Sequence, residues 1–253
     1  MLLLFDIGNT NTHLGLANAR RIVRQAGIPT RDRFNGRIKD CVLDFVGRAS
    51  VDGVALCSVV PSITPLVLKA VWLLWKLDAL ELTPRTLRGV GIDYPRPNTI
   101  GPDRLANAVA ARHHFGAPVV VVDFGTAVTF DVVNRRGDYA GGIIAPGLAA
   151  MTDYLHEKTA LLPKIKIRET RTVIGRSTEE AMLAGAVHGY RGLIRALLAK
   201  LKHELRAPRL PVVATGGYAK LIGARLPEIA RVEPNLTLEG LRLVWRLNHS
   251  EAI

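Results

Sequence analysis

The sequence has few of the features that mark secreted or membrane proteins. Cys41 and Cys57 are its only cysteines, too few for a disulfide framework, which indicates a reducing, cytoplasmic compartment. The longest uncharged stretch, residues 53–68, is shorter than the roughly 20 apolar residues of a membrane span, and two prolines interrupt it. No basic region precedes the apolar N-terminal run, so we expect neither a signal peptide nor a membrane anchor.

Aromatic residues are also scarce, at 6%, although the chain is strongly basic, with 34 Lys and Arg against 22 Asp and Glu and a net charge of +12. Nucleic-acid binding typically combines basic charge with stacking aromatics or a recognisable DNA-binding motif, so we expect no nucleic-acid partner. The densest basic run, 191–225, holds eight Lys and Arg and a single acid, Glu204. We interpret that run as a solvated face, while other positive charge could attract an anionic ligand.

What is present is the pattern of an α/β protein, in which apolar strands alternate with helices of regular apolar spacing. The expected strands are 1–7, 12–16, 22–26, 54–60, 118–123, 126–133, 139–145 and 210–215. The expected helices are 34–46, 61–77, 105–115, a long one following Ser177, and 238–247. Residues 83–102 hold four prolines and three glycines and are expected to form a long functional loop or linker.

One sequence pattern occurs twice, 117 residues apart. The first apolar strand ends in Asp6-Ile-Gly-Asn-Thr10, and the strand that opens the second half ends in Asp123-Phe-Gly-Thr126. Each is followed by a segment that predicts a hairpin. Turns favour Asp and Gly in any case, but the surrounding elements match too, which indicates an internal duplication.

A carboxylate at the end of a buried strand is costly unless a cation or hydrogen-bond donors offset its charge. Asp6 and Asp123, with glycines and small hydroxyl residues beside them, therefore suit a nucleotide triphosphate and its metal ion. The chain has no Gly-Lys pair, so a P-loop is excluded. If the two turns face one another, both carboxylates lie near one cationic centre.

Two further motifs allow both a structural and a functional interpretation. Asp103 could simply complement the dipole at the start of a helix, or it could accept a proton from a substrate hydroxyl while Arg104 holds an anionic group. Likewise, Thr215-Gly-Gly217 could be a tight strand-to-helix turn, or a place where the backbone passes close to a nucleotide. These residues alone do not decide between the alternatives.

Taken together, the motifs resemble those of the type III pantothenate kinases. The resemblance covers nearly the whole chain and rests on seven short motifs in the family's order. These are 6–10, Tyr94, 101–104, 123–126, 141–147, 177–180 and 215–217. The resemblance implies the fold of the acetate and sugar kinase/actin superfamily: two duplicated RNase H-like lobes, 1–116 and 117–253, with a nucleotide cleft between them. It also implies ATP-dependent phosphorylation of pantothenate, the first step of coenzyme A biosynthesis.

The resemblance also implies roles for individual residues. Asp103 would be the catalytic proton acceptor. ATP would be bound by Asp6, Ile7, Gly8, Asn9, Thr10, Asn11, Thr12, His13, Thr126, Gly216 and Gly217. Pantothenate would be bound by Tyr94, Gly101, Pro102, Asp103, Arg104 and Thr178. Asp123 would bind a monovalent cation, K⁺ or NH₄⁺, and Asp6 would lie near Mg²⁺ through the phosphates.

Two positions differ from the family pattern or vary within it. Pro102 stands where alanine is common, and position 13 varies, so His13 is included only as part of its turn. The family is usually homodimeric, and Gly185, Gly189 and Gly192 would suit close packing of the long helix, either against a partner or within its own lobe. A second hypothesis is a non-catalytic relative that binds nucleotide and regulates other proteins or transcription. Because Asp103 and Thr178 are both present, the sequence favours the kinase.

Overall fold

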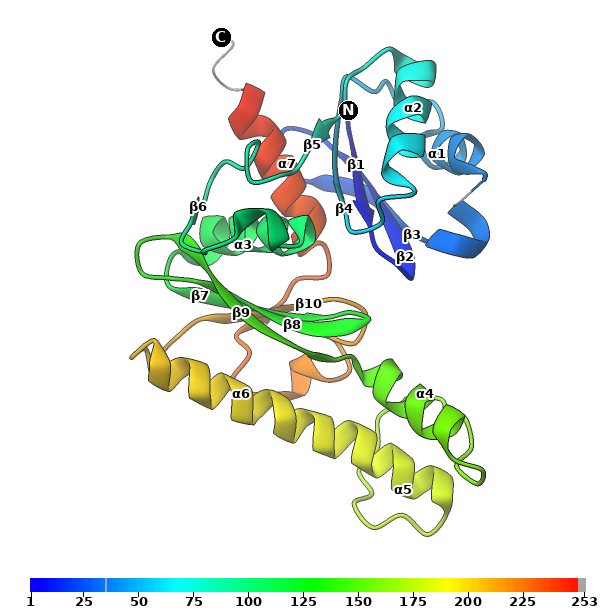
Figure 1. The fold of residues 1–253 in the computed structure, drawn as a ribbon, viewed down its shortest axis with the longest axis vertical. Coiled ribbons are helices and arrows are strands. Elements are labelled where there is room, and N and C mark those ends of the chain that lie inside the picture. The colour runs from blue at the N-terminus through cyan, green and yellow to red at the C-terminus, as the bar shows by residue number, and fades with distance from the viewer. Residues whose placement is uncertain (35, 250–253) are drawn as a thin grey trace. The chain divides into compact units, whose positions relative to one another are not determined.

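The computed structural model describes residues 1–34 and 36–249, which include every predicted site residue (Figure 1). It divides into two compact units. Unit 1 comprises 1–117, 135–140 and the segment from Asn235 onwards, and unit 2 comprises 118–134 and 141–234. The sequence predicts lobes of 1–116 and 117–253, and the chain first passes from unit 1 to unit 2 between 117 and 118. It returns to unit 1 at 135–140 and again from Asn235 onwards.

Unit 1 is built on a five-stranded sheet of order β3-β2-β1-β4-β5. The strands are β1 (Leu2–Ile7), β2 (Asn11–Ala17), β3 (Ile22–Pro29), β4 (Gly53–Ser58) and β5 (Leu80–Glu81). β1 pairs antiparallel with β2 and parallel with β4, and β2 forms the predicted hairpin with β3. The remaining elements of this part of the chain are the π-helical turn η1 (Thr30–Phe34), α1 (Ile38–Val46) and α2 (Thr64–Trp75).

The side-chain alternation of β1 explains how the site is placed. Leu3, Phe5 and Ile7 point into a core that they share with α1 and α2. Because successive side chains of a strand point to opposite faces, Leu4 and Asp6 lie on the other face. Two helices contact the strands there, α3 (Pro102–Phe115) and α7 (Leu236–His249), which lie side by side (Figure 1). Asp6 therefore faces the same side of the sheet as α3.

Unit 2 repeats this arrangement with strands of order β9-β8-β7-β10-β11. The strands are β7 (Val119–Phe124), β8 (Ala127–Val133), β9 (Asp138–Pro146), β10 (Val212–Thr215) and β11 (Arg231–Val232). β7 pairs antiparallel with β8 and parallel with β10, as β1 does with β2 and β4. The matching orders and directions confirm the predicted duplication. The first residues of β9 belong to unit 1, where they pair with β6 (Gly91–Ile92).

The helices of unit 2 are α4 (Leu148–Lys158), α5 (Thr178–Ala184) and α6 (Tyr190–Glu204), with a π-helical segment, η3 (Gly185–Gly189), joining α5 to α6. The predicted cap of the long helix is present, because the Glu180 amide donates to Ser177 Oγ over 3.2 Å. The Glu180 carboxylate, however, accepts from the Arg176 amide, so the reciprocal half of the capping box is shifted by one residue. α4 was not predicted from the sequence.

Within the described ranges, no helix combines the length and the apolar character that crossing a membrane requires. The short elements η2 (Pro97–Thr99) and η4 (Gly223–Arg225) complete the helical segments. The loop predicted over 83–102 is largely irregular, as expected, but it contains η2 and the short strand β6.

Candidate functional site

The turn after β1 is closed by its own backbone. The Gly8 amide donates to the Asn11 carbonyl over 3.0 Å, and a Cβ on Gly8 would lie 2.8 Å from that same oxygen. Only glycine therefore fits at this position. Asn9 and Thr10 are exposed at the tip of the turn. The predicted phosphate-binding segment 6–13 thus has a compact, exposed tip held between β1 and β2.

Two predicted residues of this segment have particular surroundings. The Thr12 side chain is fully buried, with its hydroxyl 3.0 Å from the Thr30 hydroxyl. Because Thr30 donates its one proton to the Gly8 carbonyl over 2.7 Å, Thr12 is the donor to Thr30. His13 lies opposite Gly27 on β3, with its ring against that glycine. The exposed tip, rather than Thr12, offers polar groups at the surface of the turn.

Thr30 itself was missed by the sequence reasoning. It is fully buried, its hydroxyl connects Gly8 with Thr12, and its amide donates to the Thr10 carbonyl over 2.9 Å. Thr30, which lies outside the turn, thus makes hydrogen bonds with three of its residues. A threonine after an apolar strand carries no distinctive signal, so the sequence could not have identified it.

We expect Thr30→Val to loosen this turn, because valine has the same shape but leaves the Gly8 carbonyl and the Thr12 hydroxyl without their partner. Losing buried hydrogen bonds in this way costs about 1–3 kcal/mol. Urea unfolding should show that loss, and steady-state kinetics should show a higher KM for ATP. Thr237→Val is the matched control, since Thr237 is also buried and its hydroxyl bonds Asn107 over 2.9 Å between α7 and α3. Equal KM values in the two variants would contradict a role for Thr30 in the turn.

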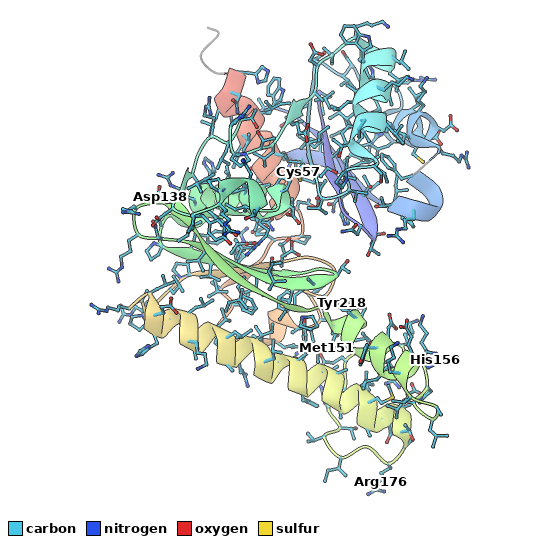
Figure 2. The ribbon with its side chains drawn as sticks, viewed as in Figure 1. Cys57, Asp138, Met151, His156, Arg176 and Tyr218 are labelled. Carbon is cyan, nitrogen blue, oxygen red and sulfur yellow. The ribbon has the colours of Figure 1, made fainter. Side chains whose placement is uncertain are left out.

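Asp6, Cys57 and Asp103 form one neighbourhood in unit 1. Asp6 is paired across β1 and β4 with Cys57, whose thiol donates to Asp6 Oδ1 over 3.5 Å (Cys57 is labelled in Figure 2). Burial raises the pKa of the Cys57 thiol well above its usual range, and the charges of Asp6 and Asp103 raise it further. The thiol therefore stays protonated beside the Asp6 carboxylate. The structure thus brings together two of the predicted acidic site residues.

Asp103 lies in the first turn of α3, which begins at Pro102, three residues before the predicted range of 105–115, with Gly101 preceding it. Burial raises the pKa of the Asp103 carboxyl, although a hydrogen bond from the Arg104 amide (2.9 Å) and the Arg104 charge oppose that effect. A Cβ on Gly101 would lie 2.5 Å from Asp103 Oδ1. Glycine at 101 therefore leaves space for the Asp103 carboxylate, which is partly desolvated at a helix start. A raised pKa makes that carboxylate a stronger base, as a general base requires.

Tyr94 and Arg104 both contact the ring of Tyr139. The Tyr94 ring makes an edge contact with Tyr139, with centroids 6.2 Å apart, and Arg104 Cζ lies 5.7 Å from the centre of the same ring. Two predicted pantothenate-binding residues from separate elements are thus joined through a residue that the sequence analysis did not single out. Thr178, the remaining one, is exposed in the first turn of α5 in unit 2.

In unit 2, Asp123 lies one residue before the end of β7 and pairs with Thr215 of β10, as Asp6 of β1 pairs with Cys57 of β4. The next residue, Gly216, has a φ of +90°, and a Cβ there would collide with the Asp123 carboxylate and lie 2.7 Å from backbone atoms of Phe124. Gly217 has open space around it. Gly216 therefore has to be glycine for the Asp123 carboxylate to keep its position.

Thr126 is exposed at the tip of the turn after β7, and its carbonyl lies against Gly147, where a Cβ would collide with it. The predicted Gly141–Gly147 motif thus touches the Asp123–Thr126 motif within unit 2. The segment 141–142 has positive φ values at both glycines.

The residues present suit the ions that the resemblance implies. Carboxylate oxygens are hard ligands, and Mg²⁺ is typically held by one or two carboxylates together with substrate phosphates. Among residues 1–34 and 36–249 there is no cluster of three or more His, Cys, Asp or Glu side chains suited to a metal ion. Asp6 in unit 1 and Asp123 in unit 2 each provide one carboxylate at a strand end beside a tight turn, which fits that shared mode of binding.

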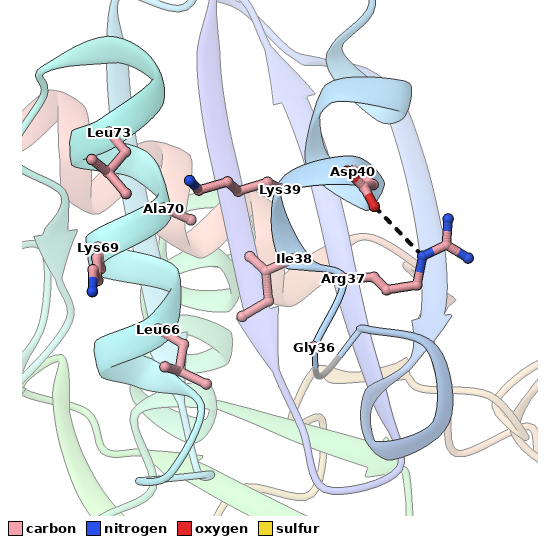
Figure 3. Close-up of a pocket in the computed structure, with 9 residues that line it drawn as sticks. All are labelled: Gly36, Arg37, Ile38, Lys39, Asp40, Leu66, Lys69, Ala70 and Leu73. Carbon is pink, nitrogen blue, oxygen red and sulfur yellow. Dashed lines mark ion pairs between the residues drawn. The ribbon is translucent and has the colours of Figure 1, made fainter.

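Unit 1 also has a surface groove of about 370 Å³ between α1 and α2 (Figure 3). Its floor includes Ile38, Leu66 and Leu73, and at its edge Arg37 pairs with Asp40 over 3.6 Å. None of the predicted site residues lines this groove. It is therefore separate from the motifs at the strand ends.

Solved structures with low sequence identity share this fold. An inorganic polyphosphate/ATP-glucomannokinase from Arthrobacter sp. strain KM matches with a TM-score of 0.53 and 14% identity, covering 98% of this chain and 99% of that one. A Campylobacter jejuni structure provisionally assigned to a Baf family of transcriptional activators matches with a TM-score of 0.64 and 20% identity, covering 98% and 99%. The two lobes with matching α/β sheets thus have the actin-like ATPase fold, as predicted.

Sequence relatives define the family. The family described as type III pantothenate kinase matches residues 2–200. A type III pantothenate kinase of Akkermansia muciniphila is 48% identical over 97% of this chain and 98% of its own length. One from Geobacter sulfurreducens is 38% identical over 98% and 99%. The chain belongs to the type III pantothenate kinase family, which confirms the resemblance drawn from its motifs.

Proposed function

We propose that this protein transfers the γ-phosphoryl group of ATP to the primary hydroxyl of pantothenate, giving 4′-phosphopantothenate in coenzyme A biosynthesis. Membership of the family supports this reaction. The observation that carries it is the Asp103 carboxylate at the start of α3, partly desolvated and in the same neighbourhood as Asp6. A base and a phosphate-binding turn near one another are what transfer to an alcohol requires.

In this proposal Asp103 accepts the proton of the pantothenate hydroxyl as its oxygen attacks the γ-phosphorus. The bond to the β,γ-bridging oxygen breaks, and ADP leaves. Burial makes Asp103 more basic than an ordinary aspartate, while the Arg104 amide holds Oδ1 in place. General-base help of this kind is worth typically ~10²–10⁴-fold in rate.

Pantothenate is a carboxylic acid, and several residues of the proposed site could recognise it. Arg104 supplies a positive charge beside Asp103, and Tyr94 supplies a half-exposed aromatic face. Gly101 and Pro102 shape the loop in front of α3. Thr178 lies in the first turn of α5, where a hydroxyl and free amides can receive a carboxylate.

ATP is assigned to the two turns and the di-glycine. Asn9 and Thr10, exposed at the tip of the first turn, are assigned to phosphate oxygens, as is the exposed Thr126 in unit 2. Gly217, which has open space around it, and its neighbour Gly216 are assigned to the nucleoside. Asp6 is assigned to Mg²⁺ through the phosphates and Asp123 to K⁺ or NH₄⁺. When bound, these cations neutralise the charge that develops on the transferring phosphoryl group.

We also propose that the protein acts as a cytoplasmic homodimer. The three small residues of the long helical segment, Gly185, Gly189 and Gly192, are exposed, and a Cβ on any of them would meet no atom within 4 Å. Packing within their own lobe, the alternative left open by the sequence, therefore does not explain these glycines. Close approach of a second chain would.

The proposed reaction is tested by measuring ADP release with pantothenate, ATP, Mg²⁺ and K⁺ in a coupled assay. We expect release only when pantothenate is present, and a rate that rises with K⁺ or NH₄⁺ but not with Na⁺ at equal ionic strength. Product analysis should show one phosphate on the primary hydroxyl. Saturable ATP binding without pantothenate-dependent ADP release at any K⁺ concentration would instead support the non-catalytic regulator.

A further inference from the structure

Tyr139 is a buried aromatic residue at the start of β9, and its side chain is only 1% exposed. Its main chain is fixed by β6, because Ile92 is its register partner and the Asp93 amide donates to its carbonyl over 2.9 Å. All of these residues belong to unit 1. The ring is therefore held by regular strand pairing rather than by a free loop.

The Tyr139 ring lies between two residues that we assign to pantothenate. The edge contact with Tyr94 has an interplanar angle of 69°, an arrangement in which a ring edge meets a ring face favourably. The Arg104 guanidinium lies within 6 Å of the ring centre, the range of a cation–π interaction. Tyr94 follows β6 and Arg104 belongs to the first turn of α3, so one ring fixes side chains from two separate elements.

Charged residues brace the strands that carry Tyr139. Arg136 pairs with Asp93 over 2.6 Å and with Asp138 over 3.2 Å (Asp138 is labelled in Figure 2), and so connects the segments on either side of the ring. Gly91 leaves no room for a side chain, because a Cβ there would collide with the Asp138 carboxylate. The β6–β9 pairing is only two residues long, but the Arg136 ion pairs and the close approach of Gly91 to Asp138 also hold the two segments together.

We propose that Tyr139 is a positioning residue of the pantothenate site. Its ring orients the Arg104 guanidinium and the Tyr94 ring without touching the reacting atoms. It should therefore govern how tightly pantothenate is held, while the transfer step and the binding of ATP stay as they are. This inference rests on the proposed function, because it names the substrate whose binding the ring controls.

The test compares Tyr139→Leu, which removes the aromatic face, with Tyr139→Phe, which keeps it. Losing a cation–π contact and an aromatic pair should raise the KM for pantothenate about 5- to 50-fold in the leucine variant. The kcat and the KM for ATP should stay within about twofold, and the phenylalanine variant should retain a KM within about threefold of wild type. If the leucine variant does not fold, Tyr139→Met replaces it in the test, because methionine fills more of the space than leucine and also lacks an aromatic face.

Phe45→Leu is the matched control. Phe45 is a buried ring of the core between α1, α2 and the sheet, and none of the proposed pantothenate residues belongs to that core. Both leucine variants should unfold at lower temperature, but only Tyr139→Leu should change the KM for pantothenate. If both change it equally, Tyr139 acts through stability alone and the proposal is overturned.

A second readout needs no turnover. In ¹⁵N-labelled protein, the side-chain Nε–Hε signal of Arg104, assigned through Arg104→Lys, should shift when Tyr139 becomes leucine and stay near its original position when it becomes phenylalanine. An unshifted signal together with an unchanged KM would overturn the role of Tyr139. Wild-type protein that releases no ADP with pantothenate, yet shows the shift, would overturn the proposed function and leave the contact standing.

Discussion

Replacing Asp103 by asparagine is expected to lower kcat by about 10²–10⁴-fold, because an amide cannot accept the hydroxyl proton. ATP binding should persist, since the proposed nucleotide residues are elsewhere. Asparagine should cost no stability at neutral pH. Burial raises the pKa of Asp103 in the folded protein, so the stability that its proton confers is present at low pH and is lost as the pH rises through the folded pKa. The variant has no carboxylate to desolvate at neutral pH, so it should be at least as stable as the wild type while its turnover is slow.

The same shift predicts the pH profile of the wild-type enzyme. Because the base acts as a carboxylate, kcat/KM should fall as the pH drops through its raised pKa, at a higher pH than for an ordinary aspartate. Asp40→Asn is the control, since Asp40 also lies in the first turn of a helix, α1, and pairs on the surface with Arg37. Unchanged turnover in Asp103→Asn, or an equal loss in Asp40→Asn, would remove Asp103 as the base.

Replacing Gly216 by alanine is expected to destabilise the protein by about 2–5 kcal/mol, since a φ of +90° is strained for alanine and its Cβ overlaps the Asp123 carboxylate. Moving that carboxylate should also raise the K⁺ concentration needed for half-maximal activity. Thermal unfolding measures the first effect, and ADP release against K⁺ measures the second.

The neighbouring glycine provides the control for that change. A Cβ on Gly217 meets nothing within 4 Å, and Gly217 is not among the residues with positive φ. Gly217→Ala should therefore change the free energy of unfolding by less than about 1 kcal/mol. If the two variants unfold alike, the close approach of Gly216 to Asp123 does not constrain the turn.

Much of the fold could be predicted because each lobe begins with a continuous apolar strand that ends in the same acidic turn. Apolar runs without helical period predict strands. The pattern of 6–10 occurs again at 123–126, which predicts that the two sheets begin alike. Both sheets then follow, with matching strand orders. The helix starts at Pro102 and Ser177 were also predictable, because their capping and dipole signals are local.

The features that could not be predicted depend on contacts between distant segments. Thr30 reaches back to Gly8, and Tyr139 joins a loop residue to a helix start, yet neither lies in a recognisable motif. The short strand β6 was hidden in a proline-rich stretch, because two residues of pairing leave no periodic signal. The sequence also did not assign 235–249 to unit 1, because the apolar spacing of an amphipathic helix does not show which sheet the helix covers.

The close packing of α7 on α3 has a consequence for how the chain folds as it is synthesised. Gly240 passes so near the Ala106 carbonyl that a Cβ there would collide with it, and Leu238 lies against Gly15 of β2. These partners emerge from the ribosome more than a hundred residues before the helix that covers them. Unit 2 can therefore finish folding first, whereas the earliest part of the chain waits with one apolar face uncovered until the last helix arrives.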